Sequence, residues 1–371
     1  MKTIKVITFT NTNNYGAMLQ AYALQKFLMS EKNRVIIINY KDQSITNNSI
    51  NTSKMNKIKF KIKNLLNEIL YGRIEQKRTK SIEDFKNNYM SLSTDIYYSI
   101  KDFELDSNQP DVYITGSDQV WNYKITNGLS DVYTLNFKTI AKKISYAASI
   151  GVDKIPDSLK QTYKNKIEKL DYISVRENES VQILKELITK KIKEVVDPTL
   201  LLTKKNWDNL ISKKNKVSNL KQDYIFVYML DPNDEFIKMV NYISEKTGLG
   251  IIHCGKRNRY KKTIKSFYEA GPIEFIQLIK GAELVLTTSF HGTVFSLIYE
   301  KTFFVMPHKT TGSRVKNLLK KLDLEDRIIN NYNEFKEKEL DSKINYKTTR
   351  KKIEDMRNES IKWLNKALED I

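Results

Sequence analysis

The sequence predicts an α/β protein with two doubly wound domains, each built on a parallel β-sheet. Short apolar runs typical of buried strands alternate with helical segments along most of the 371 residues. The first forty residues set the pattern: an apolar run at 4–9, a polar loop, a helical segment at 17–30 and a second apolar run at 34–40. This order defines a βαβ unit, which joins two parallel strands through a right-handed crossover.

The alternation continues in two series, with a junction at about residues 200–222. Later strands begin near residues 111, 142, 170 and 193 in the first series and near residues 223, 250, 283 and 302 in the second. We therefore predict an N-terminal domain of residues 1–205, a C-terminal domain of residues 206–335 and a C-terminal helical segment of residues 336–371. The segment ends in a long helix, because its apolar residues recur at helical spacing.

The chain is strongly basic, with a net charge of +19. Such a balance fits nucleic acid, an anionic membrane surface or an anionic substrate, and it also fits a lysine-rich surface without any one partner. The lysines are scattered along the whole length, and no compact nucleic-acid-binding motif occurs. We therefore expect no nucleic-acid partner.

Cysteine and histidine are rare. The one cysteine, Cys254, excludes an internal disulfide and a cysteine-based metal cluster. With three histidines, at positions 253, 291 and 308, we expect no metal site. No apolar run reaches the ~18 residues of a membrane span, and the N-terminus does not have the features of a signal peptide. We expect a cytoplasmic protein.

Residues 54–70 differ in character from the rest. Their apolar positions share one helical face and lysines cover the remainder, and we expect a basic helical insertion at about residues 54–90. A helix of this kind binds an anionic membrane surface, or it packs on the protein as an insertion. The first interpretation predicts peripheral contact with the inner face of the membrane.

The candidate site lies in the loops that follow the strands, because ligands of doubly wound sheets bind at the carboxyl ends of the strands. In one loop, His291 is the candidate general acid and base, since an imidazole titrates near neutral pH. We expect a helix at 293–300 to follow. The N–H groups of Gly292 and Thr293 and the hydroxyl of Ser289 would then offer donors to a phosphate. The alternative is a histidine that caps this helix.

Two arginines are candidates for binding a carboxylate or phosphate through the two-pronged guanidinium group. Arg176 follows a predicted strand, and Arg314 lies in a loop that opens a helix. For Arg176 the alternative is an ion pair with Glu177 or Glu179.

Two further loops supply polar groups. After the strand at 111–115, Asp118 is a candidate base for a hydroxyl, beside Ser117 and Gln119, although Ser117 or Asp118 would also serve as a helix cap. In the first loop, Asn14 and Tyr15 are candidates for hydrogen bonds to a sugar or phosphate, and Gly16 permits a close approach of the backbone. This loop does not carry the glycine pattern of dinucleotide-binding proteins.

Seven blocks of the sequence, taken in order, resemble the polysaccharide pyruvyl transferase family. They are residues 13–24, 114–122, 145–151, 173–177, 196–202, 272–305 and 313–324. Each block is a modest signal alone, whereas the ordered set extends over most of the chain. The resemblance implies two Rossmann-like domains in a GT-B-like arrangement, with the acceptor on the N-terminal domain and the donor on the C-terminal domain.

The resemblance also implies a reaction. A pyruvyl group passes from phosphoenolpyruvate, the donor substrate, to two hydroxyls of a glycan or lipid-linked glycan, without a separate cofactor. His291 and Asp118 would be catalytic, and the other loop residues would bind substrate. Several members of the family carry an arginine two residues before the histidine. Here that position is Ser289, so the identity of the donor is open.

Three other interpretations are open. A GT-B-like glycosyltransferase that uses a nucleotide sugar would share the sheet topology and the phosphate-binding helix. A member of the family without catalytic activity would bind a glycan only. The third is a nucleic-acid-binding protein, which the net charge suggests and which would bind DNA or RNA tightly and in a salt-sensitive way.

Overall fold

The computed structural model divides into two compact units. Unit 1 comprises Met1–Pro198 and Ser360–Ile371, and unit 2 comprises Thr199–Glu359. The structure describes residues 1–31, 33–42, 54–212, 217, 220, 222–308, 312–336 and 343–370, without the side chains of residues 54–70 and 336. The predicted boundaries were 205/206 and 335/336, whereas this division falls after Pro198 and within the last helix.

Unit 1 is built on a seven-stranded sheet with the order β3-β2-β1-β4-β5-β6-β7, in which every neighbouring pair is parallel. The strands are β1 (Thr3–Ile7), β2 (Arg34–Tyr40), β3 (Leu92–Tyr97), β4 (Val112–Thr115), β5 (Lys142–Ala148), β6 (Tyr172–Val175) and β7 (Ile192–Glu194). The chain runs outward from β1 to β3 and then returns to β4 on the other side of β1. The gap between β1 and β4 is therefore the topological switch point.

The helices of unit 1 include one that is buried along most of its length. They are α1 (Tyr15–Ser30), α3 (Lys54–Tyr89), α4 (Ile100–Glu104), α5 (Asp157–Ile167) and α6 (Asn178–Lys185). Helix α1 buries 13 of its 16 residues, and Asn14 caps its N-terminus by accepting hydrogen bonds from the N–H groups of Gly16 and Ala17. The apolar sequence of α1 thus specifies a central helix that fixes the loop before it.

Unit 2 is built on a five-stranded parallel sheet with the order β10-β9-β8-β11-β12. Its strands are β8 (Tyr224–Tyr228), β9 (Gly250–His253), β10 (Thr263–Ser266), β11 (Leu284–Thr287) and β12 (Thr302–Val305). Its helices are α7 (Lys204–Ile211), α8 (Asp234–Thr247), α9 (Pro272–Gly281), α10 (Phe290–Ile298), α11 (Ser313–Lys321), α12 (Tyr332–Lys336) and most of α13 (Tyr346–Glu369), with 3-10 turns at Pro198–Leu200 and Glu325–Arg327. The switch point of this sheet lies between β8 and β11.

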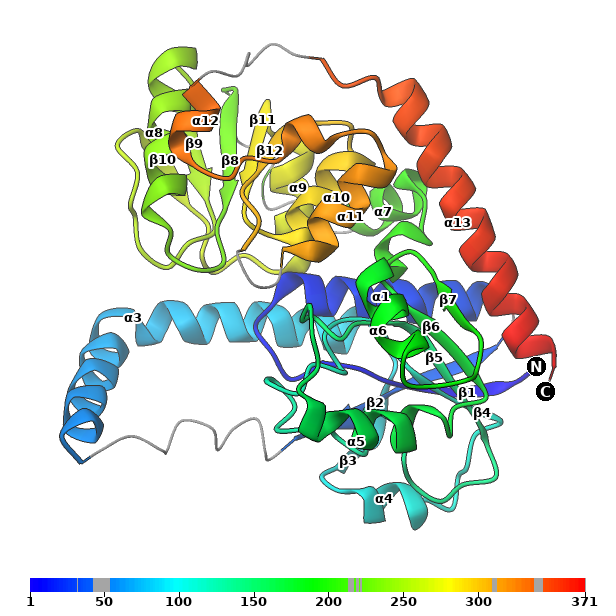
Figure 1. Ribbon diagram of the computed structural model, residues 1–371. Helices are drawn as coiled ribbons and strands as arrows, with labels where there is room; N and C mark the ends of the chain where they lie inside the picture. The colour runs from blue at the N-terminus through cyan, green and yellow to red at the C-terminus, as the bar shows by residue number, and fades with distance from the viewer. Residues whose placement is uncertain are drawn as a thin grey trace. The chain divides into compact units, whose positions relative to one another are not determined.

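The long C-terminal helix α13 contributes its first part to unit 2 and its last turns to unit 1. Its final turn lies beside the start of the chain, because Lys2 donates a hydrogen bond to the carbonyl of Leu368. Figure 1 accordingly places the N- and C-termini next to each other.

Two strands were missed from the sequence, and one helix begins earlier than expected. Strands β3 and β10 lie at sheet edges and are polar and partly exposed, so they do not show the apolar runs of the central strands. The predicted strand near 193 ends at Glu194, and a 3-10 turn follows. Helix α10 starts at Phe290 rather than at residue 293, which places His291 inside its first turn.

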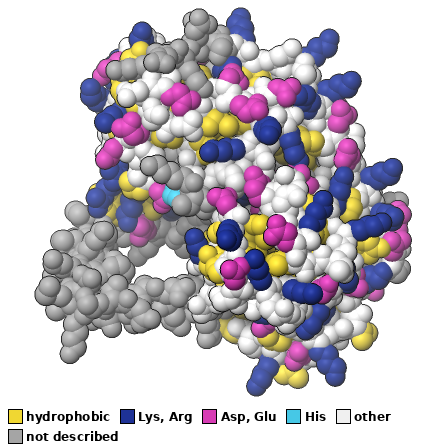
Figure 2. Space-filling view, in the orientation of Figure 1, with side chains coloured by type: hydrophobic (Ala, Val, Ile, Leu, Met, Phe, Trp, Pro, Cys, Tyr) yellow, Lys and Arg dark blue, Asp and Glu magenta, His cyan; other side chains and the backbone are white. Residues whose placement is uncertain are grey.

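The insertion forms one long helix, as expected: α3 extends over Lys54–Tyr89. The amphipathic face at 54–70 consists of side chains that lie outside the described residues, so contact with a membrane stays a prediction. On the surface shown in Figure 2, Lys and Arg side chains are spread among Asp and Glu rather than gathered in one patch.

Candidate active site

Unit 1 contains a cavity of about 440 Å³ at the switch point of its sheet. The lining comes from the carboxyl ends of β1, β2 and β4, from the first turn of α1 and from the irregular segment between β4 and β5. It consists of Phe9, Asn11, Thr12, Asn14, Ala17, Tyr40, Lys41, Asp42, Asp118, Gln119, Ile125 and Tyr133. The volume lies within the range of small-molecule sites.

The walls of this cavity combine aromatic rings with carboxylates. Tyr133 packs edge-on against Phe9 and Tyr40, with ring centroids 5.0 and 5.5 Å away. Burial, together with the charges of Asp42 and Asp118, raises the pKa of Tyr133 well above its usual value. Aromatic faces and hydrogen-bond acceptors suit a neutral, polyhydroxylated ligand. The lining holds two carboxylates, Asp42 and Asp118, against one cation, Lys41, and this balance disfavours a dianion.

Asp118 is held in a left-handed backbone conformation, with φ of 77°. Its carbonyl accepts a hydrogen bond from Ser149 N–H at 3.0 Å, and its Oδ1 accepts one from Gln119 N–H at 2.8 Å. Asp tolerates this conformation better than most residues. The loop after β4 therefore presents the Asp118 carboxylate to the cavity in a fixed position.

Arg176 lies in a buried network rather than on a ligand-binding surface. Its Nη1 is 2.8 Å from Asp197 Oδ2 and 3.2 Å from Ser117 Oγ. Asp118 Oδ1 lies 3.9 Å from its Nη2, and Glu177 Oε2 lies 3.8 Å from its Nε. Burial opposes the charge of the guanidinium, but Asp197, Glu177 and Asp118 together raise its pKa above the usual value. Three surrounding carboxylates make Arg176 a poor partner for an anionic donor, and Ser117 is fully buried in the same network.

The first loop of unit 1 reaches the cavity through Asn14 but not through Tyr15. Asn14 lines the cavity while it caps α1. Tyr15 is fully buried, and its ring and hydroxyl both contact Arg78 of helix α3. Gly16 is buried in the first turn of α1. The expected contact of Tyr15 with substrate therefore gives way to a contact within the protein.

Unit 2 has a corresponding cavity of about 430 Å³ at its own switch point. The lining follows β8, β11 and β12 and includes the start of α11. It consists of Leu230, Asp231, Pro232, Asn233, Thr288, Phe290, Met306, Pro307, His308, Gly312, Arg314, Val315 and Asn330. Arg314 supplies a guanidinium, 5.9 Å from the centre of the Phe290 ring.

The start of α11 is packed so closely that only glycine fits at position 312. A Cβ there would lie 2.5 Å from the carbonyl oxygen of His308 and 2.7 Å from Pro307 Cβ. The glycine thus lets the first turn of α11, which carries Arg314, approach the end of β12.

The first turn of α10 is capped from within the protein. Ser289 Oγ accepts from Gly292 N–H at 3.4 Å, and the Ser289 carbonyl accepts from both the N–H and the hydroxyl of Thr293 at 3.1 Å. Of the three expected phosphate donors, the two N–H groups are therefore engaged inside the helix, and the Ser289 hydroxyl accepts one of these bonds. His291 is 6% exposed, and its ring packs edge-on against Phe290, the neighbour that lines the cavity.

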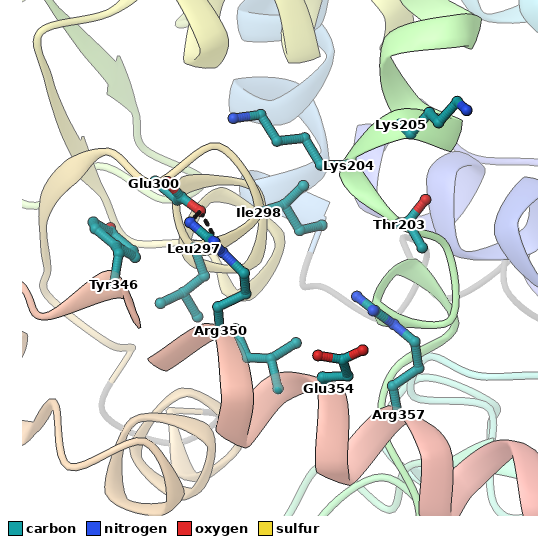
Figure 3. A pocket seen from close by; sticks show the side chains of 11 residues that line it. Thr203, Lys204, Lys205, Leu297, Ile298, Glu300, Tyr346, Arg350, Glu354 and Arg357 are labelled. Atoms are coloured by element: carbon teal, nitrogen blue, oxygen red, sulfur yellow. Dashed lines mark hydrogen bonds and ion pairs between the residues drawn. The ribbon is translucent and has the colours of Figure 1, made fainter. Parts of the chain in front are cut away.

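A third cavity, of about 380 Å³, lies in unit 2 between the start of α7, the end of α10 and helix α13 (Figure 3). Arg350 holds Glu300 through two hydrogen bonds of 3.0 and 2.6 Å, and Arg357 donates to the carbonyl of Leu200. This cavity is at the end of α10 remote from its capped N-terminus, away from the loops that follow the strands. Its arginines are engaged in contacts within the protein.

The sequence identified part of each cavity. In unit 1 the structure brings together Asn14, Asp118 and Gln119, with Ser117 and Arg176 buried beside them; in unit 2 it places Arg314 on the cavity. The aromatic wall and Asp42 were missed. Tyr40 ends a predicted strand and Asp42 follows it by two residues, which is a usable signal, whereas Tyr133 comes from an irregular segment that gives none.

Among the described residues, no group of three or more His, Cys, Asp and Glu side chains is placed to hold a metal ion. None of the helices in the described ranges combines the length and the apolar character needed to cross a bilayer.

Two parallel α/β units, each with a cavity at its switch point, define a doubly wound protein of the GT-B-like fold class. Solved structures agree. UDP-GlcNAc 2-epimerase from Methanocaldococcus jannaschii has a TM-score of 0.53 at 14% identity, with 96% of this chain and 92% of that chain covered. The S. aureus MnaA-UDP structure has a TM-score of 0.51 at 12% identity, with 90% and 86% covered. The predicted fold class is therefore confirmed.

The sequence matches the polysaccharide pyruvyl transferase family over residues 14–310. The chain belongs to this family and is accordingly a transferase. None of the curated proteins matches it.

Proposed function

We propose that this protein transfers the pyruvyl group of phosphoenolpyruvate to two hydroxyls of one sugar in a cell-surface polysaccharide or its precursor. The product is a cyclic ketal, and inorganic phosphate is released. The observation that carries the proposal is the family match over residues 14–310. The two cavities support it, because the reaction needs an anionic donor and a polyhydroxylated acceptor.

The donor fits the cavity of unit 2. Phosphoenolpyruvate carries a carboxylate and a phosphate, which a guanidinium binds through paired hydrogen bonds. Arg314 lines this cavity, and Asn233 and Asn330 add amide groups. The cation at position 314 would serve where Ser289 replaces the arginine that the family resemblance leads us to expect.

The acceptor fits the cavity of unit 1. Its aromatic side chains offer faces for a sugar ring, and Asp118 offers a carboxylate oxygen to a sugar hydroxyl. A carboxylate in this position would accept the hydroxyl proton as the oxygen attacks the donor carbon.

The proposed reaction needs one proton to be transferred to a carbon of the donor, and its bonds and protons balance as follows. The methylene carbon of the donor gains a proton, for which we propose His291 as the acid, and the adjacent carbon becomes electrophilic. Two sugar oxygens bond to that carbon, and its bond to the phosphate oxygen breaks. Of the two hydroxyl protons released, one replaces the proton given to carbon and the other leaves with phosphate.

A nucleotide sugar is the second candidate donor. The fold neighbours include a UDP complex and a UDP-GlcNAc 2-epimerase, and Ser289 stands at the position of the expected arginine. Thermal unfolding of the pure protein with phosphoenolpyruvate or with UDP-GlcNAc separates the two, because a ligand stabilises the fold that binds it.

The decisive experiment compares the host's surface glycan with and without the gene by mass spectrometry. We expect each repeat to lose the mass of one pyruvate less one water in the deletion strain, and to regain it when the gene is restored. Restoration with His291→Gln should fail if the protein is catalytic. An unchanged glycan would refute the proposal, and full restoration by the His291 variant would favour a glycan-binding role.

The reaction is proposed to take place in the cytoplasm, with an acceptor that is a free or lipid-linked glycan. Membrane docking by residues 54–70 would bring the protein to a lipid-linked acceptor. Sedimentation with vesicles of increasing anionic lipid content tests this docking. Binding that does not change with the anionic lipid content would argue against docking by the basic helix.

A further inference from the structure

Arg78 connects the long insertion helix to the loop before α1. It lies on α3, is 7% exposed, and donates hydrogen bonds to the hydroxyl of Tyr15 and, at 2.8 Å, to the carbonyl of Asn13. Its guanidinium carbon is 4.2 Å from the centre of the Tyr15 ring. The next residue of α3, Thr79, accepts a hydrogen bond from the Asn13 side chain at 3.2 Å.

The loop that Arg78 contacts forms one side of the unit 1 cavity. Asn11, Thr12 and Asn14 line the cavity on either side of Asn13. A shift at Asn13 or Tyr15 would therefore move three lining residues together. A buried guanidinium with directed hydrogen bonds restricts such a shift more than an apolar contact would, because hydrogen bonds depend on angle as well as distance.

We propose that Arg78 is a positioning residue that fixes the loop of residues 11–14 and thereby sets the affinity for the acceptor sugar. This inference rests on the proposed function, in which the unit 1 cavity holds the acceptor. It gives the insertion helix a role in the site, through a contact between residues more than 60 positions apart in the chain.

Arginine is suited to this position for a geometric reason. Its planar group donates to Tyr15 and Asn13 from different nitrogens while its face lies against the Tyr15 ring. Lysine has a single nitrogen and cannot reproduce the flat contact and both directed bonds. The substitution Arg78→Lys keeps the charge and most of the volume, so it tests the geometry alone.

The test follows phosphate release from phosphoenolpyruvate, with glycan extracted from the deletion strain as acceptor. For Arg78→Lys we expect the KM for the acceptor to rise about tenfold, the scale of one hydrogen bond to a charged group. The KM for phosphoenolpyruvate and kcat at saturating acceptor should stay unchanged. Arg73→Lys is the matched control, because Arg73 lies exposed on the same helix.

A second readout is independent of activity. Amide hydrogen exchange at residues 11–17 should be faster in Arg78→Lys than in Arg73→Lys, at equal thermal stability. An unchanged acceptor KM, or equal changes in both KM values, would overturn the inference. If the wild-type protein releases no phosphate and the glycan is unaltered by deletion, the proposed function fails. Unchanged exchange at residues 11–17 would then overturn the positioning role by itself.

Discussion

The guanidinium of Arg176 lies 2.8 Å from a carboxylate oxygen of Asp197, and their side chains are 2% and 0% exposed. This buried ion pair joins loops of unit 1 to one another. Arg176 follows β6, Asp197 follows β7, and Ser117, which follows β4, bonds to both partners. Carboxyl ends of three strands are thus joined next to Asp118, which explains how the loop after β4 keeps its unusual backbone conformation.

Removing one partner of this pair should destabilise the protein strongly. We expect Arg176→Met to lower the free energy of unfolding by about 3–5 kcal/mol, because it leaves a buried carboxylate without its counter-charge. Urea denaturation measures this. Replacing both partners, in Arg176→Met with Asp197→Leu, should recover part of the loss, since it removes the charge of Asp197, while Glu177 stays buried without the guanidinium.

The exposed pair of Arg350 and Glu300 provides the control. Its arginine side chain is 66% exposed, so Arg350→Met should cost about 1 kcal/mol or less. A cost for Arg176→Met as small as that for Arg350→Met would contradict the assignment of a buried structural pair.

Arg314 should determine affinity for the donor. We expect Arg314→Ala to raise the KM for phosphoenolpyruvate by about ten- to a hundredfold, the scale of lost hydrogen bonds to a charged group, with little change in the KM for the acceptor. Phosphate release at varied donor concentration measures both. Arg350→Ala, at the remote third cavity, should leave both values unchanged. A rise confined to the acceptor KM would assign Arg314 to the other substrate.

The central strands of both sheets could be predicted from the sequence, but the edge strands could not. Central strands such as β8 and β11 are continuous apolar runs because both faces are buried, and that pattern is visible without a structure. Edge strands such as β10, with the sequence TIKS, have exposed side chains and resemble loops. Their position is decided by pairing with a neighbouring strand.

The same limit applies to the candidate site. The loops were found because they follow strands, which is a topological rule. What each side chain contacts depends on residues far away in the chain, as Arg176 and its carboxylates at 118 and 197 illustrate. Arg78 could not be distinguished from Arg73 by sequence, because both lie in a polar helix and only one faces Tyr15.

His253 should make stability depend on pH. Burial lowers its pKa below the usual value, so the native state resists a proton that the unfolded chain accepts. As the pH falls through the unfolded-state pKa of about 6.5, the free energy of unfolding should therefore decrease, until the folded-state pKa is reached. Urea denaturation between about pH 7.5 and 5 measures the slope.

The variant His253→Gln should flatten this slope, because glutamine does not titrate. His308→Gln is the matched control, since His308 is exposed in the same unit. Equal slopes for the wild type and His253→Gln would show that other groups cause the dependence.

Gly292 should not tolerate alanine. An added Cβ would lie 2.4 Å from Thr287 Oγ1, and that hydroxyl is held by a bond to the Tyr228 carbonyl at 2.8 Å and by one from Ser289 N–H at 3.0 Å. Overpacking of this kind costs about 1–3 kcal/mol, which outweighs the gain of about 0.5–1 kcal/mol from alanine in a helix. Urea denaturation should show net destabilisation. In a Thr287→Ala background the obstructing oxygen is absent, so Gly292→Ala should cost less there. If Gly292→Ala lowers the free energy of unfolding equally in both backgrounds, a clash with Thr287 is not the reason that position 292 requires glycine.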